Sequence, residues 1–443
     1  MSSTPQPVRG TQSLLGEEAD RLSAVVDAFE RVRKLFGFKR VEVPIIERTE
    51  VFARSLGETS DVVSKEMYTF FDKGDRSITL RPEFTAGIAR AYLSEGWKRF
   101  LPLRVGTHGP VFRYEAPQAA RYRQFNQLDA EIIGIADSKA DVEVLILADE
   151  LLKELKVDEE VSLKLNTLGD NESRQRWRST LIAHFKRHVE ELSPESRERL
   201  QRNPLRVLDS KDPRDRPFID AAPLMQLTHQ ASDFFEEVKR GLDDSGVLYE
   251  LDPHLVRGLD YYRHTTFEFV TDQLGAQNAV LAGGRYDGLI EALGGPFTPA
   301  IGWAAGVERL AQLLPRAGTR ARTSAVVVES DEPVLQNIGK FLLGVLRRGG
   351  MPAQIIADGS VRKRFQRATA LETDYLLVLM ESDEPNVRAN LRVKRRIIGS
   401  DRVLGTIFGP LKSALDKQFG VRPEQLKHAS RHGGELKLLR RFQ

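Results

Sequence analysis

The sequence predicts an α+β protein with a separate α/β domain at its C-terminal end. Strand-like segments lie within residues 1–165 and 251–315, and a charged, mostly helical stretch at 166–250 interrupts them. After a linker at 316–321, apolar segments alternate as strand, helix, strand, helix and strand. Such alternation is typical of a small parallel α/β domain, which we place at 322–443.

The first segment begins with a helix. Apolar side chains from Leu22 to Phe36 recur on one helical face, and Gly37 can end the helix because glycine tolerates a left-handed conformation. Residues 41–44 alternate like a strand, with Pro44 at an edge or end. Further elements expected here are a hairpin at 69–80, strands at 103–113 and 125–135, and a helix at 141–157.

The later segments show similar patterns. Apolar residues from Trp177 to Leu192 have helical spacing, and Ser193-Pro194 suits the end of one helix and the start of the next. Strand-like sequence returns between 249 and 281. The C-terminal domain is expected to contain strands at 325–329, 354–356 and 375–380, and helices at 333–348 and 361–371.

Composition excludes several classes of protein. Cysteine is absent, which rules out disulfides and thiolate chemistry and argues against a zinc site. Residues 1–10 have no apolar core for a signal peptide, and no apolar run is long enough to span a membrane. We therefore expect a cytoplasmic protein with no membrane contact.

Charge is distributed unevenly although the net value is only +3. Basic residues concentrate at 362–364, 392–396 and 422–441. Such a face can neutralise the phosphates of a nucleic acid, or it can be a solvated surface balanced by acids elsewhere. Charge alone leaves both interpretations open.

The run at 256–269 is the most informative part of the chain. Arg257, Asp260, Tyr261 and Tyr262 enter a segment of aromatic and β-branched residues. A strand would hold these side chains rigidly beside a cleft, which suits a binding site. Taken alone, the run is also compatible with an ordinary strand that carries two amphipathic tyrosines.

Two further groups suit charged ligands. Glu83 and Thr85 combine a carboxylate with a hydroxyl, a pair able to grip an ammonium group, although a strand-terminal glutamate is usually just solvated. Arg113 and Arg121 flank a polar loop between two strands. Arginines in that position suit a nucleoside triphosphate, and Phe125 can stack on a base.

Strand spacing places Gln127, Asp129 and Glu131 on one face. An acidic, amide-bearing face is unusual on an otherwise apolar strand, so we expect it to be functional. Small residues between Gly302 and Gly306 would let the backbone approach a ligand closely, with Arg309 beside them. A tightly packed strand-to-helix junction explains that last segment equally well.

In their order, these motifs resemble motifs 1, 2 and 3 of class II aminoacyl-tRNA synthetases. Pro44, Arg113 and Arg309 stand at the characteristic positions. Val-Arg-Gly-Leu-Asp-Tyr-Tyr at 256–262 and Gly-Gly-Arg-Tyr-Asp at 283–287 are similar to the histidine-specific motifs of histidyl-tRNA synthetases. The resemblance implies an antiparallel class II sheet with flanking helices, an anticodon-binding C-terminal domain and a homodimer.

The resemblance also implies a histidine–tRNA ligase that uses L-histidine, ATP, Mg²⁺ and tRNA(His). Attack of the histidine carboxylate on the α-phosphate brings two anions together, so positioned cations would do most of the catalytic work. The implied catalytic residues are Arg113, Arg257 and Arg309, and no side chain is assigned to a metal. The implied histidine-binding residues are Glu83, Thr85, Arg113, Gln127, Glu131, Arg257, Tyr261 and Tyr262. The implied ATP-binding residues are Arg113, Glu115, Arg121, Phe125, Gly306 and Arg309.

The match is specific over residues 7–315, with departures in one loop and at two other positions, and it is looser beyond residue 315. The loop at 116–120 reads Ala-Pro-Gln-Ala-Ala, where the family usually has basic residues facing the acceptor end of tRNA. Asn126 and Phe84 stand where histidine and glycine are frequent. We therefore expect little dependence on the additional 5′ guanosine of histidine tRNAs, and heavier reading of the discriminator base or the anticodon.

Two alternative functions are compatible with parts of this pattern. The regulatory subunit of ATP phosphoribosyltransferase is a non-catalytic, histidine-sensing paralogue, but it usually lacks the C-terminal domain and parts of the catalytic set. A class II synthetase for another amino acid is disfavoured by the run at 256–262. Histidine-dependent ATP–pyrophosphate exchange distinguishes the ligase from the regulatory subunit.

Overall fold

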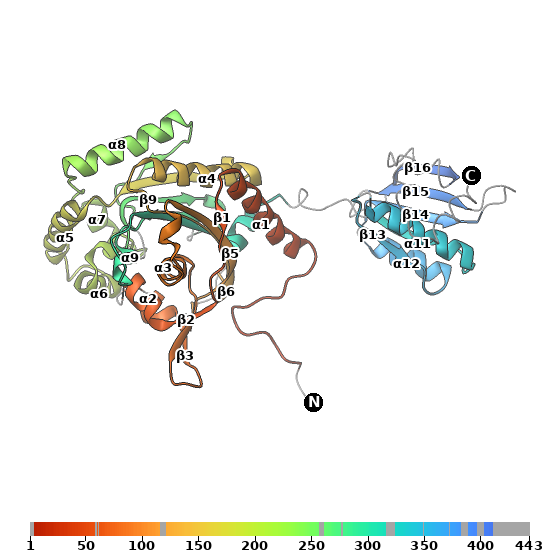
Figure 1. Cartoon of the computed structure of the whole chain (residues 1–443), viewed down its shortest axis with the longest axis horizontal. Helices are drawn as coiled ribbons and strands as arrows, with labels where there is room; N and C mark the ends of the chain where they lie inside the picture. Colours follow the sequence, from red (N-terminus) through yellow and green to blue (C-terminus); the bar gives the residue numbers. More distant parts are fainter. Residues whose placement is uncertain are drawn as a thin grey trace. The chain divides into compact units, whose positions relative to one another are not determined.

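The chain divides into two compact units, residues 1–319 and 320–443 (Figure 1). Each unit has its own sheet and its own hydrophobic core. The computed structural model describes residues 4–57, 60, 62–115, 121–256, 261–275, 278–315, 324–348, 350–371, 373–381, 389–396 and 403–410.

In the described part of the first unit, the largest sheet has eight strands in the order β1-β5-β6-β11-β10-β9-β7-β8. The pairs from β5 through to β7 are antiparallel, whereas β1 and β8 pair in parallel at the two edges. This arrangement confirms the α+β class and the antiparallel central sheet. The strands are β1 (Lys39–Arg40), β5 (Leu103–Phe112), β6 (Gln124–Ile133), β7 (Ser162–Thr167), β8 (Glu250–Leu251), β9 (Arg263–Val270), β10 (Ala279–Arg285) and β11 (Ala300–Gly306).

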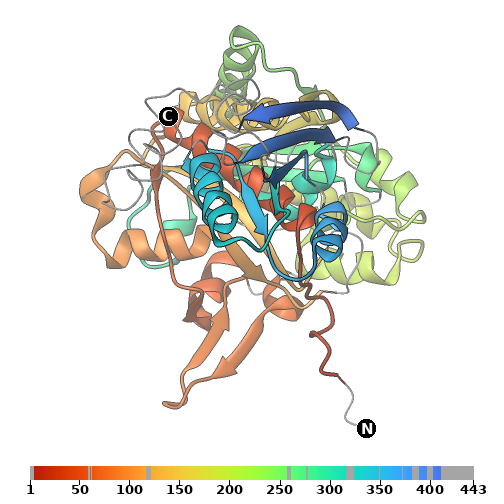
Figure 2. The same ribbon diagram turned by 90° about the vertical axis from the view of Figure 1, so that its right-hand side faces the viewer.

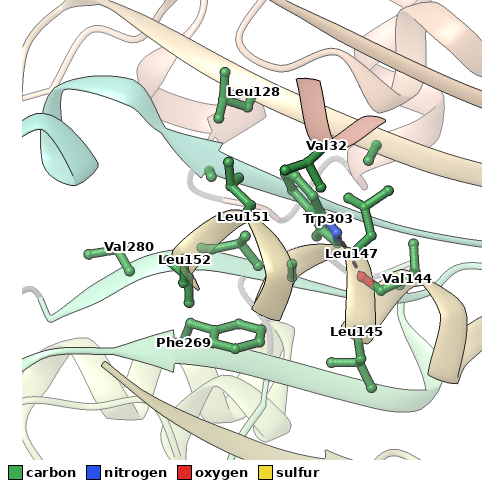
Figure 3. Packing of buried hydrophobic residues seen from close by; sticks show 14 of the residues in the cluster. Val32, Leu128, Val144, Leu145, Leu147, Leu151, Leu152, Phe269, Val280 and Trp303 are labelled. Carbon is green, nitrogen blue, oxygen red and sulfur yellow. Dashed lines mark hydrogen bonds between the residues drawn. The ribbon is translucent and has the colours of Figure 1, made fainter. Parts of the chain in front are cut away.

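One face of this sheet is covered by α1, α4, α8 and α10, of which α1, α4 and α8 are labelled in Figure 1. The apolar stripe of α4 packs against Trp303 of β11, and the indole Nε1 donates to the Val144 carbonyl at 3.0 Å (Figure 3). Burying such side chains stabilises the fold by about 1.5–3 kcal/mol each. The helices are α1 (Glu17–Leu35), α4 (Lys139–Leu155), α8 (His229–Asp244) and α10 (Val307–Leu313).

The opposite face carries α2, α3 and α9 over a second core. A small sheet of order β2-β4-β3 adjoins them, and its hairpin projects from the body in both views (Figure 1, Figure 2). The elements are β2 (Ile46–Arg48), β3 (Tyr68–Phe71), β4 (Ser77–Leu80), α2 (Thr49–Leu56), α3 (Thr85–Ser94) and α9 (Leu289–Ala292).

The strand expected at 41–44 is wrong, because β1 already ends at Arg40 and β2 begins at Ile46, and only the Val41 N–H continues the pairing, by donating to the Gly106 carbonyl of β5 at 3.1 Å. The Val43 carbonyl accepts from Arg81 Nη1 at 2.8 Å instead of from a neighbouring strand, and Pro44 has no N–H to donate. The expected alternation of buried and exposed side chains is nevertheless confirmed, since Val41 and Val43 are buried and Glu42 is exposed.

Between β7 and β8 the chain is helical. Asp170 Oδ1 accepts from Ser173 N at 2.8 Å at the start of α5, and the Ser193 hydroxyl accepts from Ser196 N at 3.2 Å at the start of α6. The helix α5 ends at Lys186, so the expectation that the helix continues to Leu192 is wrong. The helices are α5 (Asn171–Lys186), α6 (Pro194–Arg202) and α7 (Arg216–Asp220).

The described part of the second unit contains a five-stranded sheet in the order β13-β12-β14-β15-β16. The first three are parallel, as expected, but β15 and β16 add antiparallel strands that the apolar pattern did not indicate. None of the described helices, in either unit, is both long and apolar enough to cross a membrane. The elements are β12 (Ser324–Val328), α11 (Pro333–Arg348), β13 (Ala353–Ile356), α12 (Val361–Ala370), β14 (Tyr375–Met380), β15 (Asn390–Arg396) and β16 (Val403–Pro410).

Candidate active site

A cavity of about 260 Å³ opens along β6, β10 and β11. Leu128 and Ile132 of β6 join the core beneath α1 and α4, so the alternate residues Gln127 and Glu131 emerge on the opposite face. All predicted site residues in the described part of the chain line this cavity: Glu83, Thr85, Arg113, Glu115, Arg121, Phe125, Gln127, Glu131, Tyr261, Tyr262, Gly306 and Arg309.

Several sequence predictions fall on residues that the structure does not describe. Arg257 and Asp260 are among them, as is the loop at 116–120. Among the described residues, no three His, Asp or Glu side chains come together as a metal site.

We call the cavity residues Glu83, Thr85, Gln127 and Glu131 the acidic end; hydrogen bonds join Glu83, Thr85 and Glu131 within this group. The Glu83 carboxylate accepts from the backbone N–H groups of Thr85 (2.7 Å) and Ala86 (2.8 Å), which fixes it at the start of α3. The Thr85 hydroxyl donates to Glu131 Oε1 at 2.7 Å. Burial raises the pKa of Glu83 and raises that of Glu131 to about 8.

Three tyrosines line the acidic end. The Tyr261 ring lies 4.5 Å from that of Tyr262 and 5.8 Å from that of Tyr286, measured between centroids. The Tyr286 hydroxyl donates to Glu131 Oε2 at 2.6 Å. Burial raises the pKa of Tyr261 and of Tyr286 well above the usual value, so both hydroxyls stay neutral donors. Sequence reasoning assigned no role to Tyr286, although it lies within the Gly-Gly-Arg-Tyr-Asp motif.

A buried ion network holds Tyr286 in place. Arg285, with 1% of its surface exposed, pairs with Asp141 of α4 and with Asp287. Asp287 also accepts from the Ala300 backbone N–H at 3.0 Å. Removing one partner of such a buried pair typically costs 3–5 kcal/mol, roughly, because the other charge is left uncompensated. The residues on both sides of Tyr286 are therefore tied to the sheet and to α4.

Gly302 makes room for the Glu131 side chain. A Cβ atom at Gly302 would stand 1.5 Å from Glu131 Oε2, which no side chain can accommodate. The sequence indicated a close backbone approach in this segment. It assigned the space to a ligand, whereas at this position a carboxyl group of the protein occupies it.

The other end of the cavity, the basic end, gathers Arg113, Arg121 and Arg309 beside Glu115 and Phe125. The Arg113 guanidinium lies 5.5 Å from the Phe125 ring centre, and Arg121 forms an ion pair with Glu115. Burial lowers the pKa of Arg121 and of Arg309, and the positive charge of Arg121 lowers that of Arg309 further. The basic end therefore concentrates like charges that an anion would stabilise.

Glu308 is a second cavity residue to which sequence reasoning gave no role. Its carboxyl group accepts from the backbone N–H of Asn126 at 3.0 Å and from its Nδ2 at 2.9 Å. These contacts join the start of α10 to the start of β6. The only available signal was the position of Glu308 directly before Arg309.

Comparison with known proteins assigns this constellation to a family. The sequence profile of histidyl-tRNA synthetase matches residues 10–310. A histidine–tRNA ligase of Novosphingobium aromaticivorans is 57% identical over 421 residues, which cover 94% of this chain and 98% of that protein. The solved structure of apo S. aureus histidyl-tRNA synthetase is 30% identical with a TM-score of 0.70, covering 94% of this chain and 99% of that one.

A structure described as an ATP phosphoribosyltransferase regulatory subunit/histidyl-tRNA synthetase from Bacillus halodurans is also similar. It is 21% identical with a TM-score of 0.63, and the match covers 85% of this chain and 99% of that one, which shows a common fold alone. The profile match and the 57% identity to the Novosphingobium ligase decide the relationship. This chain belongs to the histidyl-tRNA synthetase family.

Proposed function

We propose that this protein is a histidine–tRNA ligase, which activates histidine with ATP to histidyl-adenylate and transfers it to tRNA(His). The observation that carries the proposal is a single cavity whose lining combines a hydrogen-bonded group of carboxyl groups with a group of arginines. An amino acid brings an ammonium group to the acidic end, while a nucleoside triphosphate brings anionic groups to the basic end. The relatives named histidine–tRNA ligase favour this function over the regulatory-subunit alternative.

The acidic end suits histidine. Gln127 Oε1 is buried and accepts no hydrogen bond from the described residues, so a substrate ammonium group would supply its missing donor. Glu83 and Thr85 would complete that contact. Neutral imidazole has one donor and one acceptor, which Glu131 and the Tyr262 hydroxyl can match from two sides. A pocket that hydrogen-bonds its substrate in this way rejects apolar analogues by about 10⁴–10⁵.

The basic end suits ATP. Phe125 would stack on the adenine with Glu115 beside it. Gly306, which has no side chain, would leave space for ATP along β11. Arg121 and Arg309 would contact the outer phosphates. Because both side chains are partly buried, their attraction to the phosphates would be stronger than in water. In this arrangement Arg121 exchanges its ion pair with Glu115 for a phosphate.

Mg²⁺ usually keeps several waters and binds through phosphates and one or two carboxylates. Glu308, a buried carboxylate that lines the cavity beside Arg309, fits that requirement and would hold the ion together with the phosphates. When bound, Mg²⁺ neutralises phosphate charge.

The chemical step needs positioned cations rather than a general base. The histidine carboxylate attacks the α-phosphate, and pyrophosphate leaves. Arg113, whose Nε donates to the Pro82 carbonyl at 2.9 Å, is held directly beside Glu83 and would contact the α-phosphate. Arg257, which lies outside the described residues, keeps the transition-state role that the family resemblance implies.

We further propose a cytoplasmic homodimer that binds tRNA through its second unit. Ile46, Phe70 and Phe71 expose 50%, 44% and 71% of their surfaces near motif 1, and such apolar exposure supports an interface there.

In the second unit Arg362 and Lys363 are exposed and suit phosphate contacts. Arg364 is different, because it is buried and paired with Asp331, so it does not belong to the expected basic face.

Histidine-dependent ATP–pyrophosphate exchange tests the proposed function. We expect exchange with histidine and none with other amino acids, such as glutamine or tyrosine. Complete absence of exchange by a folded preparation that still binds histidine would favour the regulatory subunit instead.

How the tRNA acceptor end is read stays a prediction. Arg123 lies 3.8 Å over the Tyr114 ring centre and its Nε donates to the Glu115 carbonyl, so this arginine is engaged within the protein. We expect transcripts with and without the additional 5′ guanosine to be charged at rates within about tenfold of each other, because the alanines of the loop at 116–120 offer no charged contact to this nucleotide. Losing one such contact would cost about 1–3 kcal/mol. A loss beyond about 10²-fold would show that the guanosine is read.

A further inference from the structure

The backbone of Tyr262 is held by an arginine of α5. Arg174 Nη1 donates to the Tyr262 carbonyl at 3.2 Å, across 88 residues of sequence. Hydrogen bonds from a charged donor are roughly twice as strong as those between neutral groups. The helical stretch between β7 and β8 therefore reaches a residue that lines the acidic end of the cavity.

The ring of Tyr262 packs closely against β10. A Cβ atom at Gly284 would stand 2.9 Å from Tyr262 Cδ1 and 2.6 Å from the Thr265 carbonyl oxygen, closer than a side chain can come. The Tyr261 ring confines Tyr262 further, at 4.5 Å between centroids. Because the ring is confined in this way, the position of its hydroxyl group depends on where the Tyr262 backbone is held.

The backbone that follows Tyr262 has an unusual conformation. His264, at the start of β9, has a φ of 50°, in the left-handed region that residues other than glycine seldom adopt. Its N–H donates to the Gly169 carbonyl at 3.0 Å, and its carbonyl accepts from the Leu168 N–H at 2.7 Å. Such a conformation persists only where the surroundings impose it. The connection from β7 to α5 supplies part of that constraint.

Phe234 of α8 contacts the same segment. Its ring centre lies 5.0 Å from that of His264, and the Arg285 guanidinium lies 5.3 Å from it as well. His264 comes two residues after Tyr262, and Arg285 directly precedes Tyr286. One aromatic ring therefore packs against both β9 and β10, next to two tyrosines of the acidic end.

The two helices that make these contacts are joined at their first turns. Asp170, which caps α5, also accepts from the Thr228 hydroxyl. The Thr228 N–H donates to the Ser173 hydroxyl at 3.0 Å, and the Thr228 hydroxyl caps α8 by accepting from Ala231 N at 3.2 Å. The starts of α5 and α8 thus form one support behind the tyrosines.

We propose that Arg174 and Phe234 are positioning residues through which the helical stretch between β7 and β8 holds Tyr262 and Tyr286 in the geometry that binds histidine. Neither Arg174 nor Phe234 is among the described residues that line the cavity, so each acts through the tyrosines. The inference rests on the proposed function for the identity of the ligand, and it extends the histidine pocket to residues behind its wall.

Matched pairs of full-length variants test the inference. Phe234→Leu removes the ring contacts but keeps an apolar side chain. Its control is Phe235→Leu, the same change one residue further along α8, where the ring is buried in the core and lies 5.6 Å from Lys239 Nζ. Arg174→Ala removes the donor to Tyr262. Its control is Arg178→Ala, one turn later on α5, where the side chain is exposed.

Equilibrium dialysis with radiolabelled histidine measures the Kd of each variant without ATP. We expect Phe234→Leu and Arg174→Ala to raise the histidine Kd about tenfold or more, because small displacements of pocket groups are costly. Phe235→Leu and Arg178→Ala should stay within about threefold of wild type. Phe234→Tyr keeps the ring and should also bind histidine within about threefold of wild type.

Two further readouts separate positioning from a general loss of stability. Phe235→Leu should lower Tm at least as much as Phe234→Leu, because it opens space in a closed core, and yet it should spare histidine binding. In pyrophosphate exchange, the KM for ATP should change less than about threefold in Phe234→Leu and Arg174→Ala, since the basic end keeps its own contacts.

An unchanged histidine Kd in either Phe234→Leu or Arg174→Ala would overturn the proposal. Equal losses of binding in the test variants and their controls would do the same, because stability would then explain the effect. If the wild-type protein binds histidine but shows no pyrophosphate exchange, the proposed function has failed, and the dialysis result still decides whether these residues position the pocket.

If the wild-type protein binds no histidine, hydrogen–deuterium exchange of a peptide covering residues 261–267 decides instead. This segment includes the His264 N–H that donates to Gly169. We expect its amides to exchange at least about tenfold faster in Phe234→Leu and Arg174→Ala than in wild type, with the controls unchanged. The same exchange rate in all the proteins would overturn the proposal.

Discussion

The acidic and basic ends of the cavity solve opposite electrostatic problems with different structural means. At the acidic end, Glu83 and Glu131 are 5% and 1% exposed, and backbone N–H groups or hydroxyls fix their carboxyl oxygens. At the basic end, Arg113 and Arg121 are only partly buried, and Arg121 is held by an ion pair that a ligand can replace. Rigid, deeply buried groups form the acidic end, and long, partly solvated side chains form the basic end.

The difference fits what each end would recognise under the proposed function. Discriminating one amino acid from others requires fixed donors and acceptors, because an unmatched buried polar group is costly. Stabilising a triphosphate requires concentrated charge, and its geometry changes as the reaction proceeds. We therefore expect substitutions at the acidic end to change mainly the histidine KM, and substitutions of cations at the basic end to change mainly kcat.

The largest effect is expected for Arg113→Ala. Removing a cation from the attacked phosphate should lower kcat for pyrophosphate exchange by about 10²–10³. The matched control is Arg104→Ala on β5, because Arg104 pairs with Glu143 of α4 outside the cavity. The control should retain its rate, and a similar loss of kcat in both variants would contradict a specific role for Arg113.

Glu131→Gln should have the next largest effect. The amide keeps the shape of the side chain but replaces one acceptor oxygen by an NH₂ group, so either Thr85 or Tyr286 loses its acceptor and the histidine KM should rise about 10–100-fold. The KM for ATP should change little. Steady-state exchange kinetics with each substrate varied in turn measure both values, and equal changes in the two would break the division of the cavity into independent ends.

The pH dependence of stability tests the burial of the same carboxyl. The pKa of Glu131 is about 8 in the folded protein and 4.5 in its ordinary state. Between these values the folded protein holds a proton that the unfolded chain has lost, so this contribution to stability is present at low pH and is lost as the pH rises through about 8.

Glu131→Gln removes that titration. Thermal unfolding should therefore show a variant that is more stable than wild type at about pH 8.5, by about 1–2 kcal/mol or a few degrees in Tm, with almost no difference at about pH 5. A variant less stable than wild type at the higher pH would contradict the raised pKa.

Phe125→Leu should have the smallest effect. Loss of ring stacking on adenine should cost about 1 kcal/mol, or about fivefold in the KM for ATP, with the histidine KM unchanged. Phe125→Tyr retains the ring and should restore the wild-type KM. If the leucine and tyrosine variants behave alike, stacking does not contribute at this position.

Sequence reasoning located most of the cavity because strand periodicity and motif order are local properties. Gln127 and Glu131 could be placed on one face from their spacing, and they do line the cavity together. Tyr286 and Glu308 were missed because their importance lies in contacts across 155 and 182 residues of sequence. Gly302 was noticed as small, but the carboxyl group that fills its space could not be identified from sequence spacing.

Errors in the fold have similar physical causes. Residues 41–44 alternate correctly, yet no strand forms, because the Val43 carbonyl accepts from the side chain of Arg81, 38 residues away along the sequence. In the second unit, β15 and β16 add two antiparallel strands to the edge of the parallel strands. Their pairing partners could not be inferred from the alternation of strands and helices before them.

The amino-acid sequence by itself determined the α+β class, the order of most elements, the family resemblance and which charged residues are candidates for binding. Tertiary structure alone decided how those charges are held: Glu131 between Thr85 and Tyr286, Arg285 against Asp141, and Asp129 without a donor among the described residues. The physical reason is that residue type sets which charges and hydrogen bonds are available, whereas burial and long-range contacts set their protonation and direction.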